Sequence, residues 1–204
     1  MLPADRPYVE AWNAGRGAER ERIRLRVEAL PDPFVGPRDA PIVVLARNPG
    51  WAGKELEDLG EPARAASLLG NLGDDEKRHV HSYLTDPFVD TAGGKWWRKT
   101  MRAVIEATSL QPEDLARRVL SVEFHGYHSQ DWATLPVTLP SQWFSFDLVS
   151  RAVERGAVVV VLRGQRDWEV AVPSLRGYDR AFRTKWCRPP PSVLATSVRM
   201  VLMR

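Results

Sequence analysis

The first residues that suggest chemistry stand where a short apolar run ends. The apolar residues 42–45 lead directly into Ala46-Arg47-Asn48-Pro49-Gly50-Trp51. An arginine in such a place can pair with an anion, and Pro-Gly indicates a turn at the edge of a sheet. Trp51 then belongs either to the core or to the exposed side of that turn. The pattern predicts a site loop at the end of a buried strand.

Three further loops of this kind follow predicted strands. The strand at 119–124 leads into His125-Gly126-Tyr127-His128-Ser129, and the strand at 158–162 leads into Arg163-Gly164-Gln165-Arg166. A short strand near residue 182 comes before Arg188-Pro189-Pro190-Pro191-Ser192. Open parallel sheets bind ligands beyond the carboxyl ends of their strands. We therefore expect these loops to share one site.

Several common site motifs are excluded by their spacing. Gly50-Trp51-Ala52-Gly53-Lys54 lacks the four residues between glycines, and the Ser or Thr after lysine, that a phosphate-binding P-loop needs. His79 with His81, and His125 with His128, have no firm acidic third ligand, so we expect structural or surface histidines and no metal. Ser129 has no G-x-S-x-G elbow around it, which excludes that hydrolase triad.

The periodicity of the chain predicts an α/β fold. Continuous β-branched runs such as 42–46 and 158–162 are typical of strands covered on both faces. Helical patterns alternate with these strands, so we expect a three-layer α/β/α sandwich with a mostly parallel central sheet of about four strands. The expected helices span residues 16–30, 62–72, 74–84, 96–110, 139–156 and 165–172, with a final helix in the tail.

Two local expectations concern the middle of the chain. Ala92-Gly93-Gly94 is predicted to break the chain before the helix at 96–110. In that helix Trp97, Met101, Val104 and Ile105 fall on one face, which predicts core packing rather than a ligand site.

Composition places the chain among single-domain soluble proteins. Its 204 residues suit one domain, predicted over 1–204 with residues 1–34 as a helical extension. No apolar run approaches 18 residues, and Cys187 is the only cysteine, so we expect a cytoplasmic monomer without membrane contact or disulfides. From Arg151 onward there are 11 basic and 4 acidic residues, which indicates either phosphate recognition or a solvated basic surface.

Taken in order, the loops resemble those of the uracil-DNA glycosylase superfamily. Ala46-Arg47-Asn48-Pro49-Gly50 is similar to the G-I-N-P-G form found in mismatch-specific uracil/thymine glycosylases. "VVVVLRGQ", with Arg163-Gly164, resembles the turn after the family's third strand, and "RPPPSVLAT" stands in the place of its last loop, H-P-S-P. The resemblance covers residues 35–204 and rests on the order of the segments.

The resemblance implies a protein that binds DNA and removes a deaminated or modified base without a cofactor. Asn48 matches the residue that orients the attacking water, and Gly50 matches the permissive form of the pocket. The other residues it implies are Arg47, Trp51, His125, Tyr127 and His128 around the base, and Gly164, Arg166, Arg188, Pro191 and Ser192 on the DNA backbone.

Departures from the family keep other functions open. Arg188 stands where the family has a histidine that stabilises the leaving base, and arginine cannot donate a proton near neutral pH. A non-catalytic member of the fold that binds nucleic acid or a nucleotide is one alternative. Another is an unrelated α/β enzyme that uses Arg47 and Arg163 to clamp a small anion.

Overall fold

In the described part of the chain, the fold is built around one five-stranded sheet. The computed structural model describes residues 1–53, 55–56, 62–72, 80–108 and 110–183. The strand order is β1-β3-β2-β4-β5, in which β1 pairs antiparallel with β3 and the other neighbours are parallel. The strands are β1 (Phe34–Val35), β2 (Ile42–Ala46), β3 (Val119–Glu123), β4 (Val158–Val161) and β5 (Ala181–Arg183).

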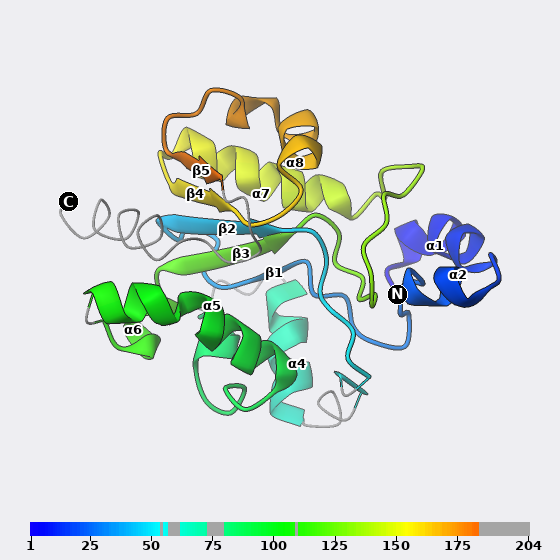
Figure 1. Ribbon diagram of the computed structural model, residues 1–204, viewed down its shortest axis with the longest axis horizontal. Helices are drawn as coiled ribbons and strands as arrows, with labels where there is room; N and C mark the ends of the chain where they lie inside the picture. The colour runs from blue at the N-terminus through cyan, green and yellow to red at the C-terminus, as the bar shows by residue number, and fades with distance from the viewer. Residues whose placement is uncertain (54, 57–61, 73–79, 109, 184–204) are drawn as a thin grey trace.

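Helices cover both faces of this sheet. Figure 1 shows α7 (Gln142–Glu154) and α8 (Gln165–Ala171) on one face, and α4 (Pro62–Leu72), α5 (Ala92–Thr108) and α6 (Pro112–Ala116) on the other. Alternate residues of β2 divide between two apolar clusters: Val43 and Leu45 pack with α7 and α8, whereas Ile42 and Val44 pack with α5 and α6. The strand is therefore buried on both sides, as its continuous apolar sequence predicts.

The remaining short elements lie around this core. The chain starts with η1 (Pro3–Asp5), α1 (Arg6–Asn13) and α2 (Ala18–Arg22), which lie beyond one end of the sheet in Figure 1. Single 3₁₀ turns form η2 (Ser82–Leu84) and η3 (Pro173–Leu175). The predicted helix at 74–84 is wrong in its described part, which holds only η2, and residues 73–79 lie outside the described part. The predicted final helix also lies outside it.

The α/β class and the mostly parallel sheet are confirmed, but among the described residues the sheet has five strands where the sequence suggests about four. The additional strand, β1, has only two residues, and Phe34 and Val35 pair with Val122 and Ser121 of β3. A two-residue strand is too short to produce a periodic pattern, so its place is set by pairing rather than by its own sequence.

The predicted helix over residues 16–30 is wrong beyond Arg22. Only Ala18–Arg22 is helical, and the chain then runs back past α1. The Asn13 side chain donates to Leu25 O at 2.8 Å and accepts from Leu25 N at 2.9 Å. The indole of Trp12 also donates to Ile23 O at 3.0 Å. These side chains satisfy backbone groups that a continued helix would otherwise pair.

The predicted break at Ala92-Gly93-Gly94 is also wrong, because these residues form the first turn of α5. Thr91 caps this turn, since Gly94 N donates to Thr91 Oγ1 at 3.0 Å. A Cβ at Gly94 would lie 2.1 Å from the carbonyl oxygen of Phe88. The glycine therefore allows the close approach of two backbone segments. Trp97 and Met101 are buried in the core as predicted.

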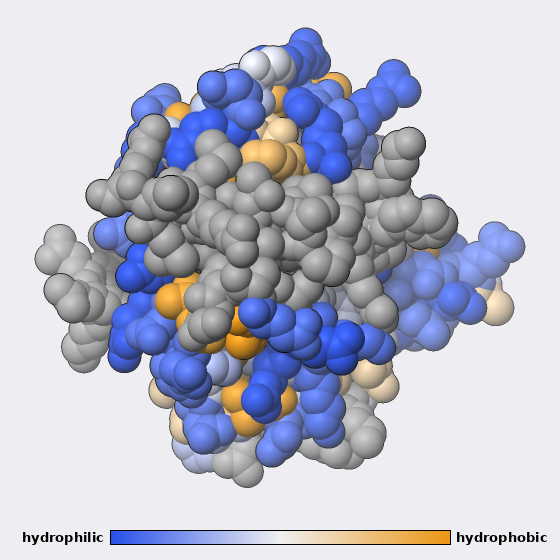
Figure 2. Space-filling model, turned by 60° about the vertical axis from the view of Figure 1, so that its left-hand side comes forward, coloured by the Kyte–Doolittle hydropathy of each residue, from blue (hydrophilic) through white to orange (hydrophobic). Residues whose placement is uncertain are grey.

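On the face seen in Figure 2, hydrophilic residues predominate and hydrophobic ones form small separate areas. No helix in the described part of the chain is both long and apolar enough to cross a lipid bilayer.

Candidate functional site

A pocket of about 400 Å³ opens at the carboxyl ends of β2, β3 and β4. Residues 46–52 after β2, residues 128–130 and 132 after β3, and residues 162–163 after β4 all line it. Three of the four predicted loops therefore meet in one place, as the geometry of a parallel sheet requires. The fourth loop, with Arg188, Pro191 and Ser192, lies outside the described residues.

Asn48 is held in this pocket through its amide nitrogen. Asn48 Nδ2 donates to Ser129 Oγ at 2.9 Å and to Pro49 O at 3.0 Å. Ser129 N donates to Pro49 O at 3.3 Å, so the loops after β2 and β3 are joined. A longer contact of 3.4 Å joins the same nitrogen to Ser129 O. Because all three bonds use the nitrogen, the side-chain oxygen of Asn48 stays available to accept a hydrogen bond from a ligand or a water molecule.

His128 and Trp51 form one side of the pocket. His128 Nδ1 lies 2.8 Å from Gly50 O, and since a carbonyl can only accept, Nδ1 carries the proton and Nε2 is the acceptor in the neutral ring. The rings of Trp51 and His128 meet edge to face at 6.2 Å. The guanidinium of Arg26 lies over Trp51 at 5.4 Å. A Cβ at Gly50 would meet nothing within 4 Å, so the pocket is open at this position.

Arginines occupy another side of the pocket. Arg47 Nη2 lies 3.4 Å from Asp167 Oδ2, and its guanidinium lies over the ring of Trp132 at 5.2 Å. Gly164 begins α8 with a φ of 72°, and a Cβ there would lie 3.1 Å from Arg47. This glycine thus supplies both the left-handed backbone and the space for Arg47. Arg163 is exposed and also lines the pocket.

Two carboxyl groups lie deep in the pocket. Glu123 is the last residue of β3, and its Oε2 is buried without a hydrogen-bond partner among the described residues. Asp32 is buried beside it and accepts a hydrogen bond from the Tyr83 hydroxyl at 2.8 Å. Burial, and secondarily the charge of Asp32, raises the pKa of Glu123 from 4.5 to about 8, and Arg163 opposes this shift. Glu123 is therefore largely neutral at pH 7.

Tryptophans supply most of the remaining wall. Trp96 and Trp97 from α5 meet edge to face at 4.7 Å, and Trp51 and Trp132 come from the loops after β2 and β3. Trp51 and Trp96 offer flat apolar surfaces that suit a planar heterocycle, whereas Trp132 already has His125 stacked on it and Arg47 over its ring. Trp97 thus belongs to the core and lines the pocket as well.

Three residues that the resemblance places in the site lie elsewhere. Tyr127 is fully buried and donates to Asp5 Oδ2 at 2.9 Å, in an apolar cluster with Val9 and Leu25. His125 stacks on Trp132 at 5.1 Å and, with the exposed Arg166, lines a second cavity of about 450 Å³. Burial lowers the pKa of His125 from 6.5 to about 4, so its ring is neutral.

Comparison of the chain with protein-family models, curated proteins and solved structures finds no match. The arrangement of the described side chains is therefore the basis for assigning a function. Sequence reasoning missed Glu123 and Asp32, although both stand beside elements that it used. Glu123 is the one charged residue of the 119–124 run, and that polar end of an apolar strand is the signal that points to it.

Proposed function

We propose that this chain is a nucleic-acid-binding protein of the uracil-DNA glycosylase-like type, with the three-layer α/β/α architecture of that group. In this proposal it excises a deaminated or otherwise modified base by hydrolysis of the N-glycosidic bond. The observation that supports it best is Asn48, held by Ser129 with its oxygen available, at the edge of an aromatic pocket beyond the strand ends.

The pocket suits a base that has left a nucleic-acid helix. Its volume of about 400 Å³ lies within the range of roughly 300–1,000 Å³ typical of small-molecule sites. Enzymes that act on a base rotate the nucleotide out of the stack and hold the base between aromatic or apolar side chains. Trp51 and Trp96 offer such surfaces. Arg163 lines the exposed side of the same pocket.

The chemistry assigned to these residues is limited to orientation and electrostatics. Asn48 accepts a hydrogen bond from water and directs its oxygen to C1′ of the sugar. The glycosidic C–N bond breaks, the base leaves with the bonding electron pair, and the water loses a proton to solvent after it adds to C1′. An amide is too weak a base to take that proton, so we expect slow turnover. Arg163 stabilises the negative charge on the departing base.

Base release from labelled oligonucleotides tests this proposal. The panel carries uracil, thymine opposite guanine, hypoxanthine, xanthine and modified guanines, in single and double strands. We expect the wild type to release at least one base and Asn48→Ala to release none, with DNA affinity changed by less than about 1 kcal/mol because the side chain acts on water. Asn48→Asp, which supplies a stronger base, should retain or exceed wild-type release. Full activity of Asn48→Ala would contradict the assignment.

A second candidate function is binding without catalysis. It is favoured by the amide at position 48, where a carboxylate would activate water more strongly. In that case no oligonucleotide of the panel releases a base. The affinity for an oligonucleotide still falls steeply with rising salt concentration, as expected when several phosphates are contacted. Tight binding of a mononucleotide with no preference for an oligonucleotide would instead indicate an enzyme for small anionic molecules.

A further inference from the structure

We propose that Asp32 and Glu123 act as an acidic pair that reads the edge of the bound heterocycle and selects a guanine-type edge over that of uracil. A guanine-type edge carries a ring N–H and an exocyclic amino group side by side. The inference rests on the proposed function, because it takes the ligand of the pocket to be a nucleobase, and it names the class of base.

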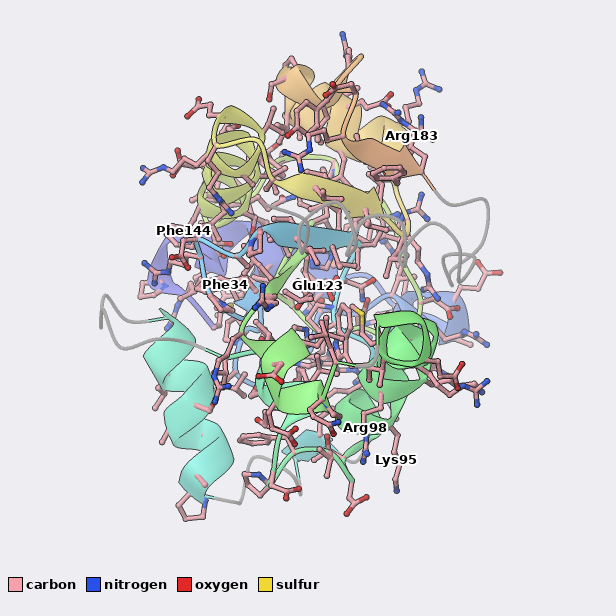
Figure 3. All side chains as sticks on the ribbon, turned by 90° about the vertical axis from the view of Figure 1, so that its left-hand side faces the viewer. Phe34, Lys95, Arg98, Glu123, Phe144 and Arg183 are labelled. Atoms are coloured by element: carbon pink, nitrogen blue, oxygen red, sulfur yellow. The ribbon has the colours of Figure 1, made fainter. Side chains whose placement is uncertain are left out.

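The backbone fixes the two carboxyl groups next to each other. Asp32 lies in the extended segment that leads into β1, and Asp32 N donates to Gly126 O at 2.8 Å. Glu123 N donates to Pro33 O at 2.9 Å, so the segment around Asp32 runs directly beside the end of β3. Figure 3 shows Glu123 near the middle of the molecule, whereas Lys95 and Arg98 of α5 point outward. The pair is thus a fixed part of the interior that faces the pocket.

The buried acceptor on Glu123 requires a donor. Glu123 Oε2 has no partner among the described residues, and a buried polar atom left without one costs roughly 1–3 kcal/mol. Asp32 already receives one hydrogen bond, from Tyr83, which fixes its orientation. Once ionised, a carboxylate accepts only, so a ligand edge that binds the ionised form of Glu123 must bring N–H groups.

Bases differ sharply in what they present to such a pair. The pairing edge of guanine offers the N1–H and the N2 amino group as adjacent donors, which can meet two carboxylate oxygens. Uracil offers one N–H between two carbonyl oxygens, and at least one of these would face a carboxyl oxygen. Hypoxanthine keeps the N1–H but lacks the amino group. The pair should therefore rank guanine first, hypoxanthine second and uracil last.

The charges around the pair are consistent with this ranking. The other titratable or charged groups that line the pocket are Arg47, Glu55, Tyr83, His128 and Arg163. The charge of Asp32 opposes the ionisation of Glu123, so with Glu123 protonated the pair carries one negative charge, which suits a donor-rich edge. Burial raises the pKa of Glu123 to about 8, and N–H donors favour its ionised form. Binding of a guanine-type edge should therefore release a proton and strengthen between pH 6 and pH 8.

Calorimetric titration of the full chain with guanosine, inosine and uridine 5′-monophosphates tests the inference, because the three share the sugar and phosphate. We expect the guanine nucleotide to bind about tenfold more tightly than the inosine nucleotide, as the loss of one amino–carboxylate contact predicts. Glu123→Gln should abolish this preference, and because its amide can donate to a uracil carbonyl, it should not weaken uridine binding. Glu55→Gln, which alters another pocket carboxyl, should keep the preference.

Folding of each variant is checked by its melting curve, and Asp32→Asn serves as a second variant if Glu123→Gln does not fold. Equal affinity for the three nucleotides, a preference for uridine, or a guanine preference that survives in the pair variants would overturn the inference. A guanine preference without any base release would support the inference about the acidic pair and contradict the glycosylase proposal. Release of uracil without any guanine preference overturns only the inference.

Discussion

The Asn48 amide nitrogen donates to Ser129 Oγ at 2.9 Å, and Ser129 Oγ in turn donates to the carbonyl of Asp131 at 2.8 Å. Ser129 is buried, and its backbone N donates to Pro49 O. The hydroxyl therefore accepts from one loop and donates within the other. This relay fixes which end of the Asn48 amide faces the pocket, and so makes Ser129 a positioning residue.

Ser129→Ala should lower the rate of base release about fivefold, because one lost hydrogen bond is worth roughly 1 kcal/mol and the Asn48 amide is then held by backbone carbonyls alone. The loss should fall on kcat with KM almost unchanged, since Ser129 acts through Asn48. Single-turnover kinetics on the best substrate of the panel measures both. Ser129→Thr, which keeps the hydroxyl, should restore most of the rate. An unchanged kcat in Ser129→Ala would show that Asn48 needs no such support.

Tyr127 is expected to contribute to stability and not to ligand binding. Its hydroxyl donates to the fully buried Asp5 and accepts from Leu2 N at 3.1 Å, which ties the start of the chain to the loop after β3. Tyr127→Phe should lower the free energy of unfolding by about 1–3 kcal/mol, the cost of leaving a buried carboxylate short of a partner. Urea denaturation measures this loss. The affinity for nucleotides should stay at the wild-type value. A large drop in this affinity would show that Tyr127 contributes to ligand binding after all.

Sequence reasoning predicted the strands that carry the pocket but not all of the groups inside it. The runs at 42–46 and 158–162 are continuous and apolar because both their faces are buried, so their ends, and hence Arg47, Asn48 and Arg163, could be found from sequence. Asp32 could not be found, because its place depends on the irregular path of the chain after Arg22. That path is set by hydrogen bonds from the α1 side chains of Trp12 and Asn13, which no local pattern reveals.

The sequence pattern also could not show which of two adjacent side chains faces the pocket. Tyr127 and His128 are adjacent, yet His128 faces the pocket and Tyr127 packs among apolar residues under the N-terminal helices. In extended backbone successive side chains point to opposite sides, so only one of the two can reach the ligand. Choosing between them requires the register, which the bridge between Arg26 and His128 sets.

Glu123 should make the protein less stable as the pH rises. Its pKa is about 8 in the folded protein against an ordinary value of 4.5. Between these values the folded protein holds a proton that the unfolded chain has lost, so the free energy of unfolding falls with rising pH, by at most about 1.4 kcal/mol per pH unit. Glu123→Gln should flatten this dependence between pH 5 and pH 8. Urea titrations across that range measure it, and parallel curves for the two proteins would contradict the assignment.

His81 should make the protein less stable as the pH falls into the acid range. Its ring is buried edge-on against Trp97 at 4.7 Å, and neither ring nitrogen has a hydrogen-bond partner among the described residues. Burial lowers the pKa of His81 from 6.5 to about 3. Between these values the unfolded chain takes up a proton that the folded protein excludes, so stability is lost as the pH falls from 6.5 toward 3.

His81→Phe should remove this loss and keep the aromatic contact with Trp97. Relative to the wild type, the variant should gain up to about 2 kcal/mol of unfolding free energy on going from pH 7 to pH 5, which is 1.4 kcal/mol for each pH unit below 6.5. His125, whose pKa is lowered to about 4 by burial, provides the matched comparison, because its titration has the same sign. Since His81 does not line the pocket, the affinity of His81→Phe for nucleotides should equal that of the wild type. If His81→Phe and the wild type lose the same unfolding free energy between pH 7 and pH 5, the ring of His81 is already protonated, or exposed, in the folded protein.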